Sequence, residues 1–190
     1  MKLVLSFFLF TTIFTNAYAG DCFRLNSPSD LEISFESYTT PRKNPVVIGF
    51  SQFELTGAAQ AKSPHSVMNG LNVVIKTDES SLITDNPARQ TIVANYFFQK
   101  MTGGGDIKAH FSSVDEDLAY LQVELNQQKR EVPMHTSFQD GVFKAYGHID
   151  VFDFKLDKPF QALDNICQEL HDGKTWNVVK IMVQASIKGC

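Results

Sequence analysis

The sequence predicts an all-β fold in which about eight antiparallel strands form a barrel or a sandwich. Three observations lead to this prediction. From Leu31 onward the chain is a series of short runs rich in β-branched and aromatic residues. Apolar and polar residues alternate within these runs with the period of two that is typical of a half-buried strand. The segments between the runs have the length and residue types of hairpin turns, which favour antiparallel neighbours.

The first run, LEISFESY at 31–38, shows the alternation most clearly, because Leu31, Ile33 and Phe35 fall on one face and the polar residues on the other. The later runs, in chain order, are VVIGFSQFEL, LNVVIKT, IKAHFSSV, YLQVEL, EVPMHTSF, VFKAYGHIDV and a last strand over 178–188. The turn QDG joins two of them, and its Gly141 can adopt a positive φ. The polar stretch 56–68 predicts a mobile loop.

Two segments have helical rather than strand character. Asn86 is a good N-cap and Pro87 suits the first helical position, so a helix is predicted to begin there. In the second segment, PFQALDNICQELHDG, apolar residues recur at helical spacing and Gly173 ends the pattern. These segments predict one or two short helices beside the sheet.

The N-terminus resembles a secretory signal peptide over residues 1–19. Lys2 supplies a positive charge, an apolar run covers 3–14, and AYA at 17–19 matches a cleavage site. The run is shorter than a membrane-spanning helix, so we expect no stable membrane insertion and a soluble, periplasmic or secreted protein. Residues 20–190 have the size of one domain.

Three cysteines follow the predicted signal peptide, and an oxidising compartment favours one bridge among them. Cys190 is the last residue and can fray, whereas Cys167 sits in a predicted helix, so we expect a bridge between Cys22 and Cys167. The alternative, Cys22 with Cys190, requires that the first and last strands of a closed barrel bring both ends together.

The polar residues show no pattern of a catalytic or metal site. His110, His135 and His148 lie on different predicted strands and lack the paired spacing of zinc ligands, and the parity of His110 and His148 indicates outward faces. His171 follows Cys167 by four residues, but nothing in the sequence indicates the electropositive setting that a reactive thiol needs. We therefore expect no enzyme activity, metal or cofactor. The net charge of −4 also disfavours a nucleic-acid partner.

The large inward residues of the predicted strands are apolar. They are Phe35, Phe50, Phe111, Leu121, Val123, Met134 and Phe138. An eight-stranded barrel is just wide enough to be filled by side chains or to hold one small ligand. The pattern alone therefore leaves a packed core and a lipid pocket as alternatives.

Three stretches in order along the chain resemble the YceI-like family of exported polyisoprenoid-binding proteins. They are SSLITDNPARQTIVANYFF, EVPMHTSFQDGVFKAYGHIDVFDF and CQELHDGKTWNVVKIMVQASI; the last resembles a variant branch with a helix and GKTW before the final strand. The resemblance implies a lipocalin-like barrel that holds an isoprenoid or another long-chain amphiphile. The alternative is a filled barrel acting as a structural, stress or interaction protein without a lipid.

The resemblance also places the adjacent Phe97 and Phe98 just after a helix, at the opening of the barrel. One ring would then face the cavity and the other the underside of the helix. With these two residues, the expected cavity lining comprises Phe35, Phe50, Phe97, Phe98, Phe111, Leu121, Val123, Met134 and Phe138.

Overall fold

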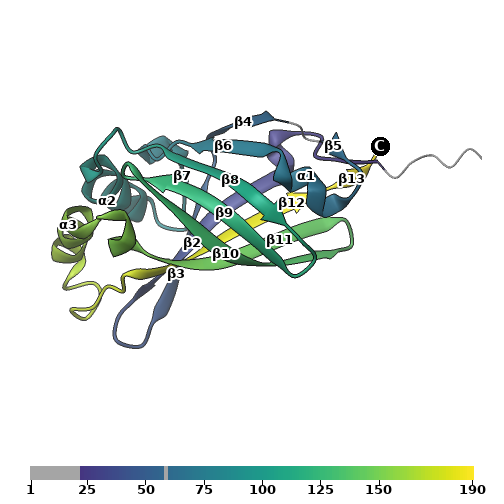
Figure 1. Ribbon diagram of the computed structural model, residues 1–190. Coiled ribbons are helices and arrows are strands. Elements are labelled where there is room, and N and C mark those ends of the chain that lie inside the picture. Colours follow the sequence, from purple (N-terminus) through teal and green to yellow (C-terminus); the bar gives the residue numbers. More distant parts are fainter. Residues whose placement is uncertain (1–21, 58–59) are drawn as a thin grey trace, which may run out of the picture.

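The computed structural model describes residues 22–57 and 60–190. The predicted signal peptide, residues 1–19, lies outside these ranges. The described residues form one ten-stranded sheet, a small three-stranded sheet, three α-helices and four 3₁₀ turns (Figure 1). The predicted all-β, antiparallel fold is confirmed.

The large sheet has the strand order β4-β6-β8-β9-β10-β11-β12-β2-β3-β7, and every neighbouring pair is antiparallel. Its strands are β2 (Leu31–Thr39), β3 (Asn44–Phe50), β4 (Phe53–Gly57), β6 (Leu71–Ile75), β7 (Leu82–Ile83), β8 (Ile107–Val114), β9 (Leu118–Leu125), β10 (Gln128–Gln139), β11 (Val142–Asp150) and β12 (Val178–Ser186).

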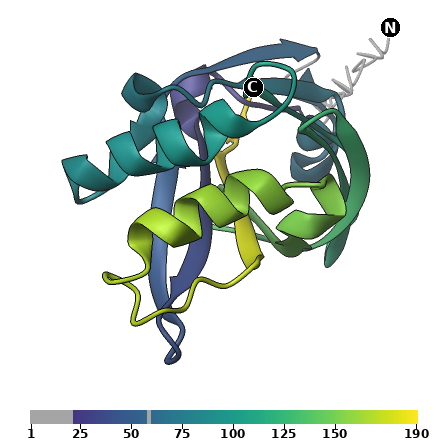
Figure 2. The same ribbon diagram turned by 90° about the vertical axis from the view of Figure 1, so that its left-hand side faces the viewer.

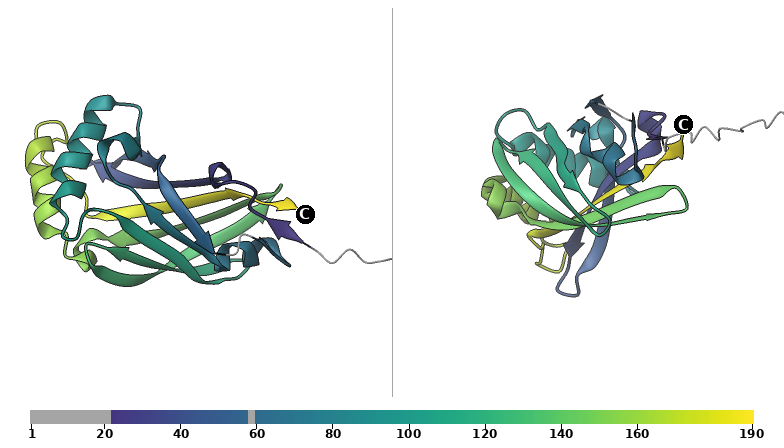
Figure 3. Two further views of the ribbon diagram at one scale, coloured as in Figure 1. Left: turned by 90° about the horizontal axis from the view of Figure 1, so that it is seen from above. Right: turned by 45° about the vertical axis from the view of Figure 1, so that its right-hand side comes forward.

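A bend between β3 and β4 closes this sheet into a barrel. Only Ser51 and Gln52 separate the two strands, yet β3 pairs with β2 and β4 pairs with β6, at opposite ends of the strand order. The Ser51 amide donates to the Ser81 carbonyl at 2.8 Å, and the Lys76 amide donates to the Gln52 carbonyl at 3.0 Å. Figure 3 shows the resulting curled sheet from two further directions. Since β3 and β4 act as one bent strand and β7 has two residues, the barrel has the predicted eight principal strands.

Helices α2 (Pro87–Tyr96) and α3 (Asp157–Cys167) lie across one end of the barrel, as Figure 2 shows. The predicted cap of α2 is present, because the Asn86 side chain accepts from the Ala88 amide at 3.0 Å and Pro87 follows it. Over the described residues, no helix is both long and apolar enough to span a bilayer. The 3₁₀ turns are η1 (Pro28–Asp30), η2 (Glu79–Ser81), η3 (Phe98–Lys100) and η4 (Val151–Phe154).

The opposite end of the barrel is covered by α1 (Pro64–Asn69), where the sequence predicted a loop. The Ser63 hydroxyl accepts from the Ser66 amide at 3.2 Å, so Ser63 caps this helix. Val67 and Met68 are buried and fill the barrel end. Beside α1 lies the small sheet of β1 (Phe23–Arg24), β5 (Gln60–Ala61) and β13 (Lys188–Gly189).

The disulfide joins Cys22 to Cys190, with a Cα–Cα distance of 5.2 Å. The predicted bridge between Cys22 and Cys167 is therefore wrong. The C-terminus does not fray, because Phe23 pairs with Gly189 in the small sheet and the Cys190 amide donates to the Cys22 carbonyl at 2.9 Å. Cys167 is a buried free thiol on α3, at the other end of the barrel.

Candidate ligand-binding cavity

An apolar cavity of about 580 Å³ occupies the half of the barrel that lies under α2 and α3. Buried Met68 and Leu71 line its inner end. Its opening, which we call the mouth, is bounded by the half-buried Arg89 and Trp176 and the exposed Asn44 and Leu170. The cavity thus runs from the surface beside the two helices toward the end closed by α1.

The walls of the cavity come from the inward faces of the strands and from the helices above them. Apolar strand residues of the wall include Ile33, Phe35, Ile48, Phe50, Val73, Ile75, Ile107, Ala109, Phe111, Leu121, Val123, Leu125, Ile149, Val179, Ile181 and Val183. Helix α3 contributes Phe160, Leu163 and Cys167 at helical spacing. Alternation along the strands therefore places inward side chains of seven strands, β2, β3, β6, β8, β9, β11 and β12, around one volume.

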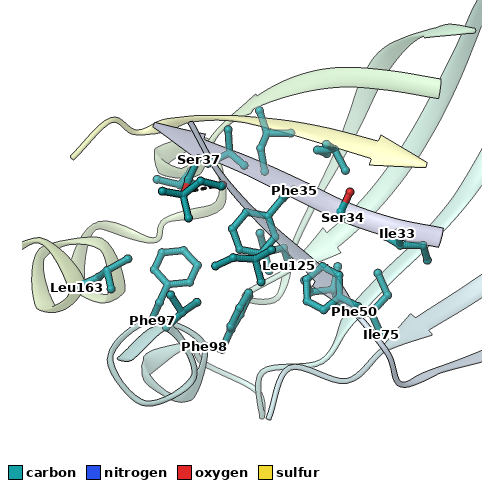
Figure 4. Close-up of a pocket in the computed structure, with 18 of the residues that line it drawn as sticks. Ile33, Ser34, Phe35, Ser37, Phe50, Ile75, Phe97, Phe98, Leu125 and Leu163 are labelled. Carbon is teal, nitrogen blue, oxygen red and sulfur yellow. Dashed lines mark hydrogen bonds between the residues drawn. The ribbon is translucent and has the colours of Figure 1, made fainter. Parts of the chain in front are cut away.

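Four phenylalanine rings form the centre of the wall, and Figure 4 shows them pointing toward one another. The rings of Phe35, Phe50 and Phe98 form a triangle with centroid distances of 5.7, 6.1 and 6.1 Å. Phe97 packs edge-on against Phe98 at 5.3 Å. Aromatic pairs prefer such tilted and edge-to-face contacts, so the cluster is a well-packed surface.

Both Phe97 and Phe98 line the cavity, where the sequence predicted that one ring would lie under the helix. Helix α2 ends at Tyr96, and the 3₁₀ turn η3 starts at Phe98. This change of helix type at Phe97, with φ −113° and ψ −70°, turns both side chains to the same side. Phe98 is almost fully buried and Phe97 is half-buried nearer the surface.

Seven of the nine predicted lining residues border the cavity, and Met134 and Phe138 do not. Both lie toward the end of the barrel closed by α1. A Cβ on Gly147 would meet the Met134 sulfur at 2.5 Å, so Met134 fills the space over this glycine. Phe138 packs against His65 of α1, with ring centroids 6.0 Å apart. The structure therefore does not place these two residues at the cavity, where the sequence predicted them.

The mouth carries the polar groups of the cavity. The Arg89 guanidinium is ion-paired with Asp85 and donates to the Thr84 hydroxyl at 3.1 Å. His171 Nδ1 lies 3.1 Å from the Thr175 hydroxyl, and burial lowers the pKa of this imidazole. Beyond these groups most lining side chains are apolar, with Ser34, Ser37 and Thr39 of β2 among the few polar ones, so the cavity suits a ligand with an apolar body.

The histidines do not converge. His110, His135 and His148 are exposed, which strand parity predicted for His110 and His148. His65 was not singled out by sequence, and its ring packs between Phe138 and Phe143 at 6.0 and 6.1 Å. Within residues 22–57 and 60–190, no three His, Cys, Asp or Glu side chains form a group able to hold a metal ion.

Cys167 is a buried thiol that borders the cavity. It is 4% exposed, and burial together with the nearby Asp164 carboxylate raises the pKa of this thiol. Because the thiolate is the reactive form, we expect alkylation at neutral pH to be slower than for a free cysteine in solution. Mass spectrometry after timed exposure to N-ethylmaleimide measures this rate. The same reaction in urea provides the control, and equal rates in both conditions would contradict the buried position.

A closed antiparallel barrel with two helices across one end is a lipocalin-like fold. Solved structures share this fold. BcnA of Burkholderia cenocepacia matches with a TM-score of 0.55 at 13% identity, over 84% of this chain and 97% of that one. A polyisoprenoid-binding domain from Saccharophagus degradans, implicated in plant cell wall breakdown, matches with a TM-score of 0.51 at 10% identity, over 86% and 98%.

A mutant CJ YCEI protein matches with a TM-score of 0.50 at 14% identity, over 77% of this chain and 86% of that one. No family model and no curated protein sequence matches the chain. At these identities the likeness concerns the fold, and the YceI-like barrel fold implied by the sequence motifs is confirmed.

Proposed function

We propose that this protein binds the apolar tail of an isoprenoid or another long-chain amphiphile in the barrel cavity, and carries or sequesters it. The observation that carries the proposal is the apolar cavity of about 580 Å³ with its four-phenylalanine wall. This volume falls in the range of about 300–1,000 Å³ that small-molecule sites occupy. The likeness to a polyisoprenoid-binding domain supports an isoprenoid ligand.

Burial of an apolar tail supplies the affinity without any catalytic group. Each CH₂ removed from water contributes about 0.8 kcal/mol, so a tail of several isoprene units provides enough free energy for tight binding. The alternative of a filled barrel describes only the end closed by α1, where Val67 and Met68 are buried. It does not account for the cavity under α2 and α3.

The proposed site of action is the periplasm or the extracellular space, after removal of a signal peptide over residues 1–19. The Cys22–Cys190 disulfide supports this location, because disulfides persist in oxidising compartments.

Extraction of the purified protein into organic solvent, followed by mass spectrometry, identifies a co-purified ligand. Titration of the delipidated protein with a fluorescent long-chain probe then measures affinity. We expect Ala109→Phe to weaken probe binding about tenfold or more, because the added ring fills cavity volume that the tail would occupy.

A control is His148→Phe, which places a phenyl ring on the exposed outer face of β11 in place of the imidazole. This variant should bind the probe as wild type does, and thermal unfolding verifies that both variants fold. Unchanged affinity in Ala109→Phe would exclude the cavity as the binding site. Failure of the wild-type protein to bind any amphiphile would refute the proposed function.

A further inference from the structure

The mouth of the cavity contains a tryptophan with two lysines over its ring. The Lys43 ammonium lies 4.3 Å from the centroid of the Trp176 ring, and the Lys174 ammonium lies 4.7 Å from it. Lys43 belongs to the turn between β2 and β3, and Lys174 to the segment after α3. We call these two residues the lysine pair.

Trp176 is held in place by the end of β2. Its amide donates to the Tyr38 carbonyl at 3.0 Å, and its indole Nε1–H donates to the Thr40 carbonyl at 2.8 Å. The Thr40 amide donates in turn to the Lys174 carbonyl at 2.9 Å. The ring also lines the cavity, so a fixed aromatic surface connects the apolar interior with the lysine pair outside.

The two ammonium groups lie near the same ring, and their charges repel each other. Among the residues that the structure describes, neither lysine has a carboxylate within ion-pair distance; the ion-paired cations there are Lys76, Arg89, Lys108 and Lys129. Asp172 is two residues from Lys174 but forms no such pair. The attraction of each ammonium to the ring is about 0.5–1 kcal/mol at an exposed site, which leaves most of its charge available to an anion.

Arg89, unlike the lysine pair, has a carboxylate as its ion-pair partner. It also borders the mouth, but Asp85 already neutralises its guanidinium. An anion at the mouth therefore gains more from Lys43 and Lys174 than from Arg89.

We propose that the lysine pair and Trp176 bind the anionic head group, a phosphate or diphosphate, of an amphiphile whose tail lies in the cavity. This inference rests on the proposed function and names the ligand class more closely. The tail follows the apolar wall inward, and the head group stays at the surface, where the two ammonium groups lose little of their hydration.

The intrinsic fluorescence of Trp176 provides the measurement, because it is the single tryptophan of the chain. We would titrate the protein with farnesyl diphosphate and with farnesol, which has the same tail and an uncharged head. Lys43→Gln and Lys174→Gln should each weaken the diphosphate about 3- to 5-fold, and the double variant more than either, while farnesol affinity stays unchanged. Higher ionic strength should weaken only the diphosphate.

Two controls isolate the charge. Lys144→Gln removes an exposed lysine on the outer face of β11 and should leave both affinities unchanged. Lys43→Arg keeps the positive charge and should restore diphosphate binding.

The outcomes separate this inference from the proposed function. Binding of both farnesyl compounds with equal affinity, and no effect of the lysine variants, would overturn the head-group site and leave the lipid cavity intact. Absence of binding of both farnesyl compounds, while a fluorescent long-chain probe still binds wild type, would overturn the head-group site alone. Absence of binding of the probe as well would overturn both. Inorganic diphosphate binding as tightly as farnesyl diphosphate would show an anion site unconnected with the cavity. Anionic vesicles binding in place of monomeric ligand would show a membrane-surface role instead.

Discussion

Loss of the disulfide is expected to lower the free energy of unfolding by up to about 5 kcal/mol. The Cys22–Cys190 bridge closes a loop with a sequence separation of 168 residues, and in the chain-entropy model the stabilisation grows with loop length. The variant that tests this is Cys22→Ser with Cys190→Ser, since a single replacement leaves a thiol free to mispair. Urea unfolding of the wild type and this variant, under oxidising conditions, gives the difference.

Cys167→Ala serves as the control for this prediction. It removes the buried thiol and leaves the bridge intact, so its cost reflects only lost packing on α3. Peptide mapping of the unreduced wild type should recover a cross-link between the peptides of Cys22 and Cys190. A link from Cys22 to Cys167 would contradict the structure, because those residues lie at opposite ends of the barrel.

The sequence was sufficient to predict most strands, because each has one face in the core and one in water. The alternation in Leu31–Thr39 is one example, since Leu31, Ile33 and Thr39 are buried and Glu32 is exposed. The bend at Ser51 and Gln52 could not be predicted in this way. It depends on contacts with Lys76 and Ser81, which only the closed sheet brings near.

Helix α1 and the disulfide were missed for different reasons. The pair Ser63-Pro64 is a standard helix start, and it was overlooked because the surrounding residues are polar and small. The disulfide depends on the pairing of β1 with β13, strands of two residues each. Such short strands carry no periodic signal, so sequence cannot detect that they hold both termini together.

For the cavity, strand parity predicted which side chains point inward but not how far along the barrel each one lies. Met134 and Val123 are both buried inward residues, yet only Val123 borders the cavity. The difference arises because α1 fills the end where Met134 lies. The lysine pair is also a tertiary feature, since Lys43 and Trp176 are far apart in the sequence and meet only where the chain after α3 joins β2.

We expect the stability of the protein to respond differently to the loss of a phenylalanine ring at the two ends of the barrel. Phe143, at the end closed by α1, is 0% exposed and contacts His65 and Phe111. Phe98 is 3% exposed, but one side of its ring borders the cavity. Replacement of a buried phenylalanine by alanine costs about 3–5 kcal/mol, and the cost grows with the packing lost. We expect Phe143→Ala to lower the free energy of unfolding by an amount near the upper end of this range, and Phe98→Ala by an amount near the lower end.

Urea unfolding of both variants measures these costs, and Tyr96→Ala, an exposed site on α2 next to Phe97, provides a control with a small expected change. A saturating amphiphile then separates the two sites further. Ligand at about 100 times its dissociation constant stabilises the folded state by about 2.7 kcal/mol. Phe143→Ala should retain this increment, since its ring does not border the cavity, whereas Phe98→Ala should lose part of it with the contacts of the ring. Equal increments in both variants would show that the tail does not contact the Phe98 ring.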